Sequence, residues 1–120
     1  MPSLDLAIIG AGPVGATVAA LSAAPDLRIA VFESRPAPSG EPRILALSHA
    51  SRMLLEDALA WPASRATPIA SIHISQKGGP GRTLLEASEQ GLPALGYTVS
   101  YAALEEALTR RLHDLGIPIH

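Results

Sequence analysis

The 120-residue sequence contains no cysteine, and only 3% of its residues are aromatic. Without cysteine the chain has no disulfide framework, no thiolate metal site and no cysteine nucleophile, which fits a reducing compartment. The formal net charge is -2 and no basic patch stands out, which argues against nucleic acid as a partner.

Long hydrophobic runs and a secretory leader are also missing. Residues 6–24 are largely apolar, but glycines, Pro13 and Thr17 interrupt them in a way that a membrane span does not favour. The N-terminus lacks the basic segment of a secretory signal. With 48% apolar and 17% charged residues, the composition is typical of a globular protein of one domain. We therefore expect a cytoplasmic protein.

The first third of the chain has the pattern of a βαβ unit. Residues 4–9 are apolar except for Asp5, which predicts a strand buried on both faces of a parallel sheet. Residues 13–24 are small and compatible with a helix, with Pro13 in the first turn and Pro25 as the stop. Residues 28–33, "RIAVFE", predict a second buried strand. We expect these two strands to be parallel, joined by a right-handed crossover.

The remainder mixes helices with short strands. Residues 34–42 have the composition of a loop, and residues 69–87 predict an antiparallel hairpin around the turn "QKGGPGR". Residues 96–100 predict a short strand, and residues 117–120 the start of another. A helix over 48–59 would begin at Ser48 or Ser51, and a second helix covers 101–115. Their apolar faces consist of Met53, Leu54, Leu55 and Leu59 in the first helix and Leu104, Leu108, Leu112 and Leu115 in the second. The predicted fold class is α/β.

Three glycines follow the first predicted strand in the spacing G-x-G-x-x-G. Gly10 permits a tight turn, Gly12 has no side chain to keep a pyrophosphate off the backbone, and Gly15 lets helix and strand pack closely. The N-terminus of the following helix offers unpaired amides and a partial positive charge to the same pyrophosphate. The pattern therefore predicts a dinucleotide site, and the alternative is a tight turn without a ligand.

Glu33 ends the second predicted strand, eighteen residues beyond Gly15. Its carboxylate is placed to accept hydrogen bonds from the ribose hydroxyls of an adenosine group, and it would repel the extra phosphate of NADP. The alternative is a solvated strand end. These residues do not by themselves separate FAD from NAD.

Five segments together resemble the N-terminal third of the class A flavin-dependent aromatic hydroxylases, and most of all the ubiquinone-biosynthesis ring hydroxylases. They are "DLAIIGAGPVGATVAAL", "VFESRP", "EPRILALSHASRMLLE", "WPASRATPIASIHISQKGGPGR" and "GLPALGYTVSYAALEEAL". The resemblance implies an FAD enzyme that takes electrons from NAD(P)H, uses oxygen and hydroxylates an electron-rich phenol ring. FAD carries that chemistry, while the protein binds and orients it.

By this resemblance, Arg43 matches an arginine that reaches the flavin side of the site, with an ordinary surface arginine as the alternative. Ala102 stands beside Tyr101 where the family often has an arginine near the flavin. The family's later motifs, including a Gly-Asp segment, are not in the sequence. The predicted cofactor-binding residues are Gly10, Gly12, Pro13, Val14, Gly15, Glu33, Ser34, Arg35 and Arg43.

No catalytic constellation or metal site is predicted, because the four histidines, His49, His73, His113 and His120, have no metal-ligand spacing. The resemblance divides the chain into residues 1–66 and 97–120 of an incomplete FAD-binding domain and residues 67–96 of a substrate-domain hairpin. It implies a small aromatic substrate and allows peripheral membrane association of the full-length enzyme. We expect the 120-residue chain alone to be inactive, to hold little flavin and to self-associate through exposed strand edges. A stand-alone nucleotide-binding module and an NAD-dependent dehydrogenase domain remain alternatives.

Overall fold

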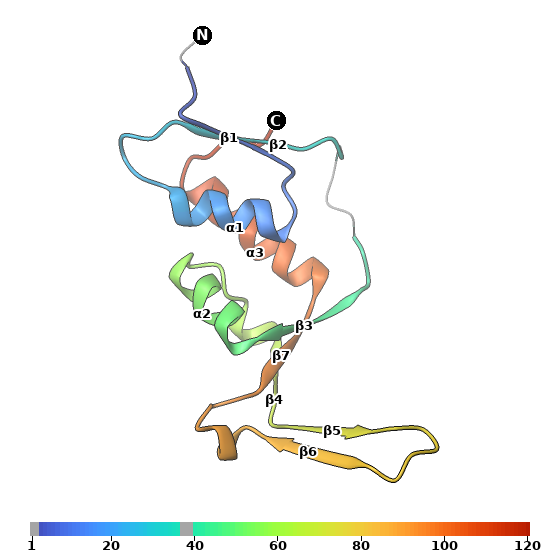
Figure 1. The fold of residues 1–120 in the computed structure, drawn as a ribbon. Helices are drawn as coiled ribbons and strands as arrows, with labels where there is room; N and C mark the ends of the chain where they lie inside the picture. The colour runs from blue at the N-terminus through green and yellow to red at the C-terminus, as the bar shows by residue number, and fades with distance from the viewer. Residues whose placement is uncertain (1–2, 37–39) are drawn as a thin grey trace.

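The structure is a computed structural model that describes residues 3–36 and 40–120. Its outline is elongated, with principal extents of 64 × 29 × 24 Å and the antiparallel hairpin at the end opposite the two termini (Figure 1). The loop predicted over residues 34–42 includes residues 37–39, which lie outside the described residues. The architecture is mixed α/β, with a Rossmann-like βαβ unit and an antiparallel sheet, so the predicted fold class is confirmed.

The βαβ unit forms as the sequence predicts. Strand β1 (Leu6–Ile9), helix α1 (Pro13–Ser22) and strand β2 (Ile29–Phe32) follow one another, and the two strands pair in parallel. The chain returns to this sheet at its last residues, where Ile119 forms a parallel bridge with Val31 and the amide of His120 donates to the Val31 carbonyl at 2.8 Å. The segment over which a strand was predicted to begin, residues 117–120, therefore lies beside β2, but it pairs through one isolated bridge and is not a regular strand.

Helices α1 and α3 (Tyr101–Asp114) pack together on one side of this sheet (Figure 1). Their contact combines small side chains of α1, such as Ala16 and Ala19, with Leu108 and Leu112 of α3 in one core cluster. The other side of the sheet has no helix among the described residues, and Ile9 is 83% exposed. The prediction that the first strand is buried on both faces is therefore wrong, because helices cover only one face of it.

A second sheet contains three antiparallel strands in the order β3-β7-β4. Strand β7 (Gly96–Ser100) lies in the centre, between β3 (Ile44–Ser48) and β4 (Ala66–Ile69). Sequence analysis predicted β7 but missed β3 and β4. The segment "ILALS" is short, and its strand character comes from pairing with β7, about fifty residues away in the sequence.

Helix α2 spans His49–Asp57, and Ser48 is its N-cap. The Ser48 hydroxyl accepts the amide of Ser51 at 3.1 Å, so Ser48 is the N-cap of the two that were predicted. Its predicted apolar face is largely wrong. Only Leu55 is buried. Met53 and Leu54 are exposed because the described residues place no further layer over this side of the helix. Leu59 is exposed because the helix ends at Asp57 and Leu59 follows it with φ +55°. The short helix η1 (Ala63–Arg65) connects α2 to β4.

The predicted hairpin is present as β5 (Ser71–Ser75) and β6 (Arg82–Glu86), followed by the short helix η2 (Ser88–Gln90). It projects away from the helices, and every residue of β5 is exposed (Figure 1). No helix within residues 3–36 and 40–120 has the length and apolar character needed to cross a membrane.

Candidate functional site

The turn after β1 brings the start of α1 to the end of the parallel sheet. Gly10 adopts φ +101°, a conformation that favours glycine, and its amide donates to the Phe32 carbonyl at 2.7 Å. Gly12 is the N-cap and Pro13 the first residue of α1. The first backbone bond of the helix runs from the Ala16 amide to the Gly12 carbonyl at 2.9 Å. The amides of Val14 and Gly15 precede that bond, so they fall among the helix donors without an intrahelical acceptor.

The three glycines serve different purposes. A Cβ atom on Gly15 would overlap the carbonyl oxygen of Gly10 and come within 3.3 Å of the Ile8 side chain, so the fold itself requires glycine there. A Cβ atom on Gly12 would meet only the Tyr101 hydroxyl, at 4.0 Å. The fold does not need glycine at position 12, and the open space in front of it is what a close-lying pyrophosphate would use.

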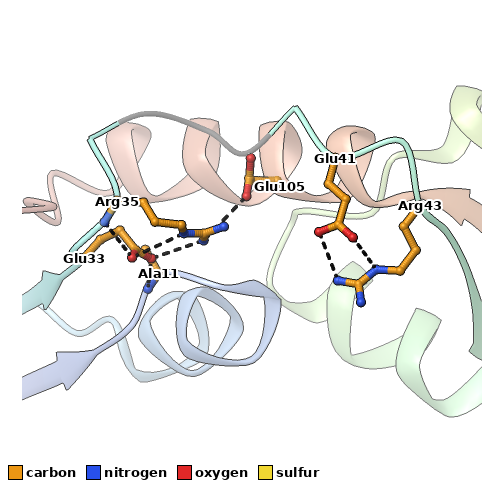
Figure 2. A network of polar contacts seen from close by, with 6 residues as sticks. All are labelled: Ala11, Glu33, Arg35, Glu41, Arg43 and Glu105. Carbon is orange, nitrogen blue, oxygen red and sulfur yellow. Dashed lines mark hydrogen bonds and ion pairs between the residues drawn. The ribbon is translucent and has the colours of Figure 1, made fainter.

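Glu33 extends from the end of β2 toward this turn. Its Oε2 atom accepts the backbone amide of Ala11 at 2.9 Å, and its Oε1 atom accepts the backbone amide of Arg35 at 3.1 Å (Figure 2). The Arg35 guanidinium adds contacts to both oxygens at 3.3 and 3.4 Å. These donors, with the Arg35 side chain first, lower the pKa of Glu33 to about 2 and keep it ionised at neutral pH.

Arg35 reaches from the β2 end to helix α3. Its Nη2 atom lies 3.3 Å from Glu33 Oε2 and 3.8 Å from Glu105 Oε2 (Figure 2). Hydrogen bonds to Glu33 and then to the Tyr101 hydroxyl raise the pKa of the Arg35 guanidinium. One cation therefore stands between two carboxylates that come from different elements.

A cleft of about 340 Å³ opens beside this network. The residues that follow β2, one face of α3 and the returning C-terminal segment line it, and Phe32 stacks on His120 at a ring-centroid distance of 5.3 Å. The walls thus offer two carboxylates, an arginine and an imidazole next to apolar atoms, which suits the ribose and base of a nucleotide. The lining residues are Ala11, Glu33, Ser34, Arg35, Pro36, Glu105, Thr109, Ile119 and His120.

Arg43 forms a separate group of contacts. Its guanidinium pairs with Glu41 at 3.2 Å (Figure 2). The same guanidinium lies over the Tyr101 ring, 5.1 Å from the centroid. The Tyr101 hydroxyl in turn approaches the space in front of Gly12. Arg43 is therefore connected to the glycine turn through Tyr101, and it does not contact Glu33.

The comparisons with known proteins agree with this geometry. Residues 8–44 match the NAD(P)-binding Rossmann-like domain. This segment begins in the second half of β1 and contains the glycine turn, α1, β2 and Glu33, so the match covers most of the βαβ unit and its candidate site.

Several solved monooxygenases and oxygenases share the fold of this chain. The p-nitrophenol 4-monooxygenase PnpA from Pseudomonas putida DLL-E4 is 19% identical, with a TM-score of 0.77 over 96% of this chain and 31% of its own. A 2-methyl-3-hydroxypyridine-5-carboxylic acid oxygenase is 15% identical, with a TM-score of 0.78 over 96% of this chain and 30% of its own. The flavin-dependent monooxygenase PieE, solved with FAD and substrate, is 17% identical, with a TM-score of 0.72 over 97% of this chain and 23% of its own. The chain thus spans less than a third of each.

The structure brings most of the predicted site residues together. Gly10, Gly12, Pro13, Val14 and Gly15 form the turn and first helical residues, and Glu33, Ser34 and Arg35 line the adjoining cleft. Their roles toward a cofactor stay predictions. Sequence analysis missed Glu105, although a signal was present: it lies four residues after Tyr101 and three before Leu108, on the buried face of α3. It also missed the Ala11 amide, which no side-chain pattern reveals.

Proposed function

We propose that this chain is the FAD-binding N-terminal part of a flavin-dependent monooxygenase that hydroxylates an aromatic ring with NAD(P)H and O2. The observation that carries the proposal is the 2.9 Å contact between Glu33 and the Ala11 amide, because it fixes an ionised carboxylate beside the start of α1. A ribose acceptor and a pyrophosphate-binding helix end then lie next to each other, as an adenosine diphosphate group requires.

The residues of this chain would bind and orient FAD, which supplies the redox chemistry when bound. The amides of Val14 and Gly15 would donate to the pyrophosphate, Glu33 would accept from the adenosine ribose, and Arg43 would face the flavin end. Residues 1–66 and 97–120 would form part of the cofactor domain, and residues 67–96 would begin the substrate domain. The proposed substrate is a prenylated phenol of the ubiquinone-precursor type.

An NAD-dependent dehydrogenase domain is the second candidate, because the family description that matches residues 8–44 refers to NAD(P). Both candidates use the same adenosine diphosphate site and differ in the other half of the dinucleotide. The fold similarity to flavin-dependent PieE over 97% of this chain favours the first candidate.

Equilibrium dialysis of the concentrated chain against FAD, NAD and NADP separates these candidates. We expect FAD to be retained most and NADP least, because a 2′-phosphate would meet the Glu33 carboxylate. Retention will be weak for all three, because affinity for so large a cofactor is distributed over many contacts. Glu33→Ala should lower FAD retention, whereas Glu86→Ala on the distant strand β6 should leave it unchanged.

Three other results would count against the flavin-dependent monooxygenase. Stronger retention of NAD than of FAD would favour the dehydrogenase domain over the flavin enzyme. No retention of any dinucleotide would contradict both. If the reading frame continues beyond residue 120, we expect a Gly-Asp segment downstream, and its absence from a longer product would count against the monooxygenase.

A further inference from the structure

Glu105 is a buried carboxylate that the proposed cofactor contacts do not use. It lies on the core-facing side of α3, 8% exposed, between Leu104 and Leu108. Burying a carboxylate is unfavourable unless a charged or hydrogen-bonding group compensates it. Its Oε2 atom faces Arg35 Nη2 at 3.8 Å across the cleft, which is longer than a hydrogen bond and within ion-pair distance.

Glu33 has no acceptor site left for a ribose in this arrangement. An ionised carboxylate offers about four lone-pair sites. Oε2 accepts from the Ala11 amide and from Arg35 Nη2, and Oε1 accepts from the Arg35 amide and from Arg35 Nε. A ribose hydroxyl must therefore displace one of these donors before Glu33 can accept it.

The Arg35 side chain is the donor that is easiest to displace. Its two contacts to Glu33, at 3.3 and 3.4 Å, are longer than the two backbone contacts at 2.9 and 3.1 Å. The backbone amides of Ala11 and Arg35 are fixed by the chain, whereas the Arg35 side chain is flexible and 41% exposed. The second carboxylate that it faces is Glu105.

We propose that Glu105 is a positioning residue that takes over the Arg35 guanidinium when ribose hydroxyls bind to Glu33. The inference rests on the proposed adenosine-diphosphate site. Arg35 has one carboxylate at 3.3 Å and another at 3.8 Å, so a small rotation of its side chain exchanges one partner for the other. The exchange keeps the cation paired and frees one site on each Glu33 oxygen.

The test compares two probes, ADP and 2′,3′-dideoxy-ADP, which differ only in the ribose hydroxyls. Dissociation constants come from the chemical shift of the Ala11 amide in the 15N-labelled full chain. The readout is the hydroxyl preference, defined as the dissociation constant for the dideoxy nucleotide divided by that for ADP. Because both probes carry the same base and phosphates, a change in the general shape of the site does not move this ratio.

Glu105→Gln should lower the hydroxyl preference about five-fold, the size expected for one partly exposed charge pair. Arg35→Gln should raise it, because the competing donor is gone. In the Arg35→Gln background, Glu105→Gln should have no further effect. Glu106→Gln is the matched control on the same helix: Glu106 pairs with Arg65 and Arg110 and does not line the cleft, so the ratio should not change.

An unchanged ratio in Glu105→Gln, a lowered ratio in Arg35→Gln, or an effect of Glu105→Gln that persists without Arg35 would each overturn the inference while leaving the proposed site intact. If neither nucleotide shifts the Ala11 amide of the unmodified chain, the proposed site itself is wrong and the inference with it. Should Glu105→Gln fail to fold, Glu105→Asp withdraws the carboxylate by one methylene and must lower the same ratio.

Discussion

The Oε2 atom of Glu33 accepts the backbone amide of Ala11 at 2.9 Å, across 22 positions of the sequence. This contact connects the end of β2 to the turn that follows β1 and places a carboxylate at the beginning of α1. Because a main-chain donor holds one side of the carboxylate and Arg35 the other, Glu33 has a defined orientation before any ligand arrives. Such preorganisation reduces the entropy that a ligand would otherwise lose on binding.

The pH dependence of stability should report this contact. The Glu33 pKa falls from 4.5 to about 2 on folding, so the unfolded chain binds more protons in that interval. The contribution of Glu33 to the free energy of unfolding is complete above about pH 4.5 and is lost as the pH falls toward 2. Urea unfolding at several pH values should therefore show that the free energy of unfolding depends less on pH in Glu33→Gln than in the unmodified chain.

Arg35→Gln provides a companion to that experiment. It removes the largest cause of the shift but leaves the Ala11 amide in place, so its pH profile should lie between those of the unmodified chain and of Glu33→Gln. Equal slopes for all three proteins would contradict the assigned contacts.

Gly15→Ala should unfold more readily than the unmodified chain. The new Cβ atom would overlap the backbone carbonyl oxygen of Gly10, which cannot rotate away as a side chain does. We expect a loss of about 2–3 kcal/mol in the free energy of unfolding, the upper part of the range for overpacked sites. Thermal and urea unfolding measure it, and an unchanged midpoint would show that β1 and α1 are not packed as described.

Gly12→Ala should separate folding from binding. Its Cβ atom meets only the Tyr101 hydroxyl at 4.0 Å, and the backbone at φ −69° suits alanine. We expect the free energy of unfolding to change by less than about 1 kcal/mol, while FAD and ADP binding weaken because the methyl group fills the space before the helix end. Normal nucleotide affinity in this variant would place the pyrophosphate elsewhere.

Tyr97→Phe tests the attachment of α2 to the second sheet. The buried Tyr97 hydroxyl accepts Arg52 Nη1 at 2.9 Å and hydrogen-bonds His49 Nδ1 at 3.0 Å. Phenylalanine keeps the ring packed on Trp61 and removes only these bonds. We expect a loss of about 1–2 kcal/mol by urea unfolding, with ADP affinity unchanged since the cluster is separate from Glu33. A neutral substitution would mean that water replaces the hydroxyl.

The sequence was sufficient to predict the local elements. The βαβ unit, the hairpin, β7 and α3 each have a periodic pattern and clear turn or cap residues at their ends, and all are present. The glycine spacing also placed the turn at the end of the parallel sheet, because Gly10 and Gly15 are fixed by local geometry.

Features that depend on residues far apart in the sequence were harder to predict. Strand β3 exists through pairing with β7, and the exposure of Ile9 and Met53 depends on which layers are present rather than on the pattern of either segment. The Arg35–Glu105 pair joins a loop to a helix seventy positions away. Self-association and membrane association stay predictions.

The central claim is that an adenosine diphosphate group binds between the start of α1 and the end of β2. Titration of the 15N-labelled chain with ADP tests it most directly, with every backbone amide as a reporter. We predict that the largest shifts occur at the amides of Ala11, Val14, Gly15 and Glu33. In the Glu33→Ala variant, the shifts at Ala11 and at the amide of residue 33 should disappear. Shifts confined to the hairpin or to α2, or none at saturating ADP, would contradict the account.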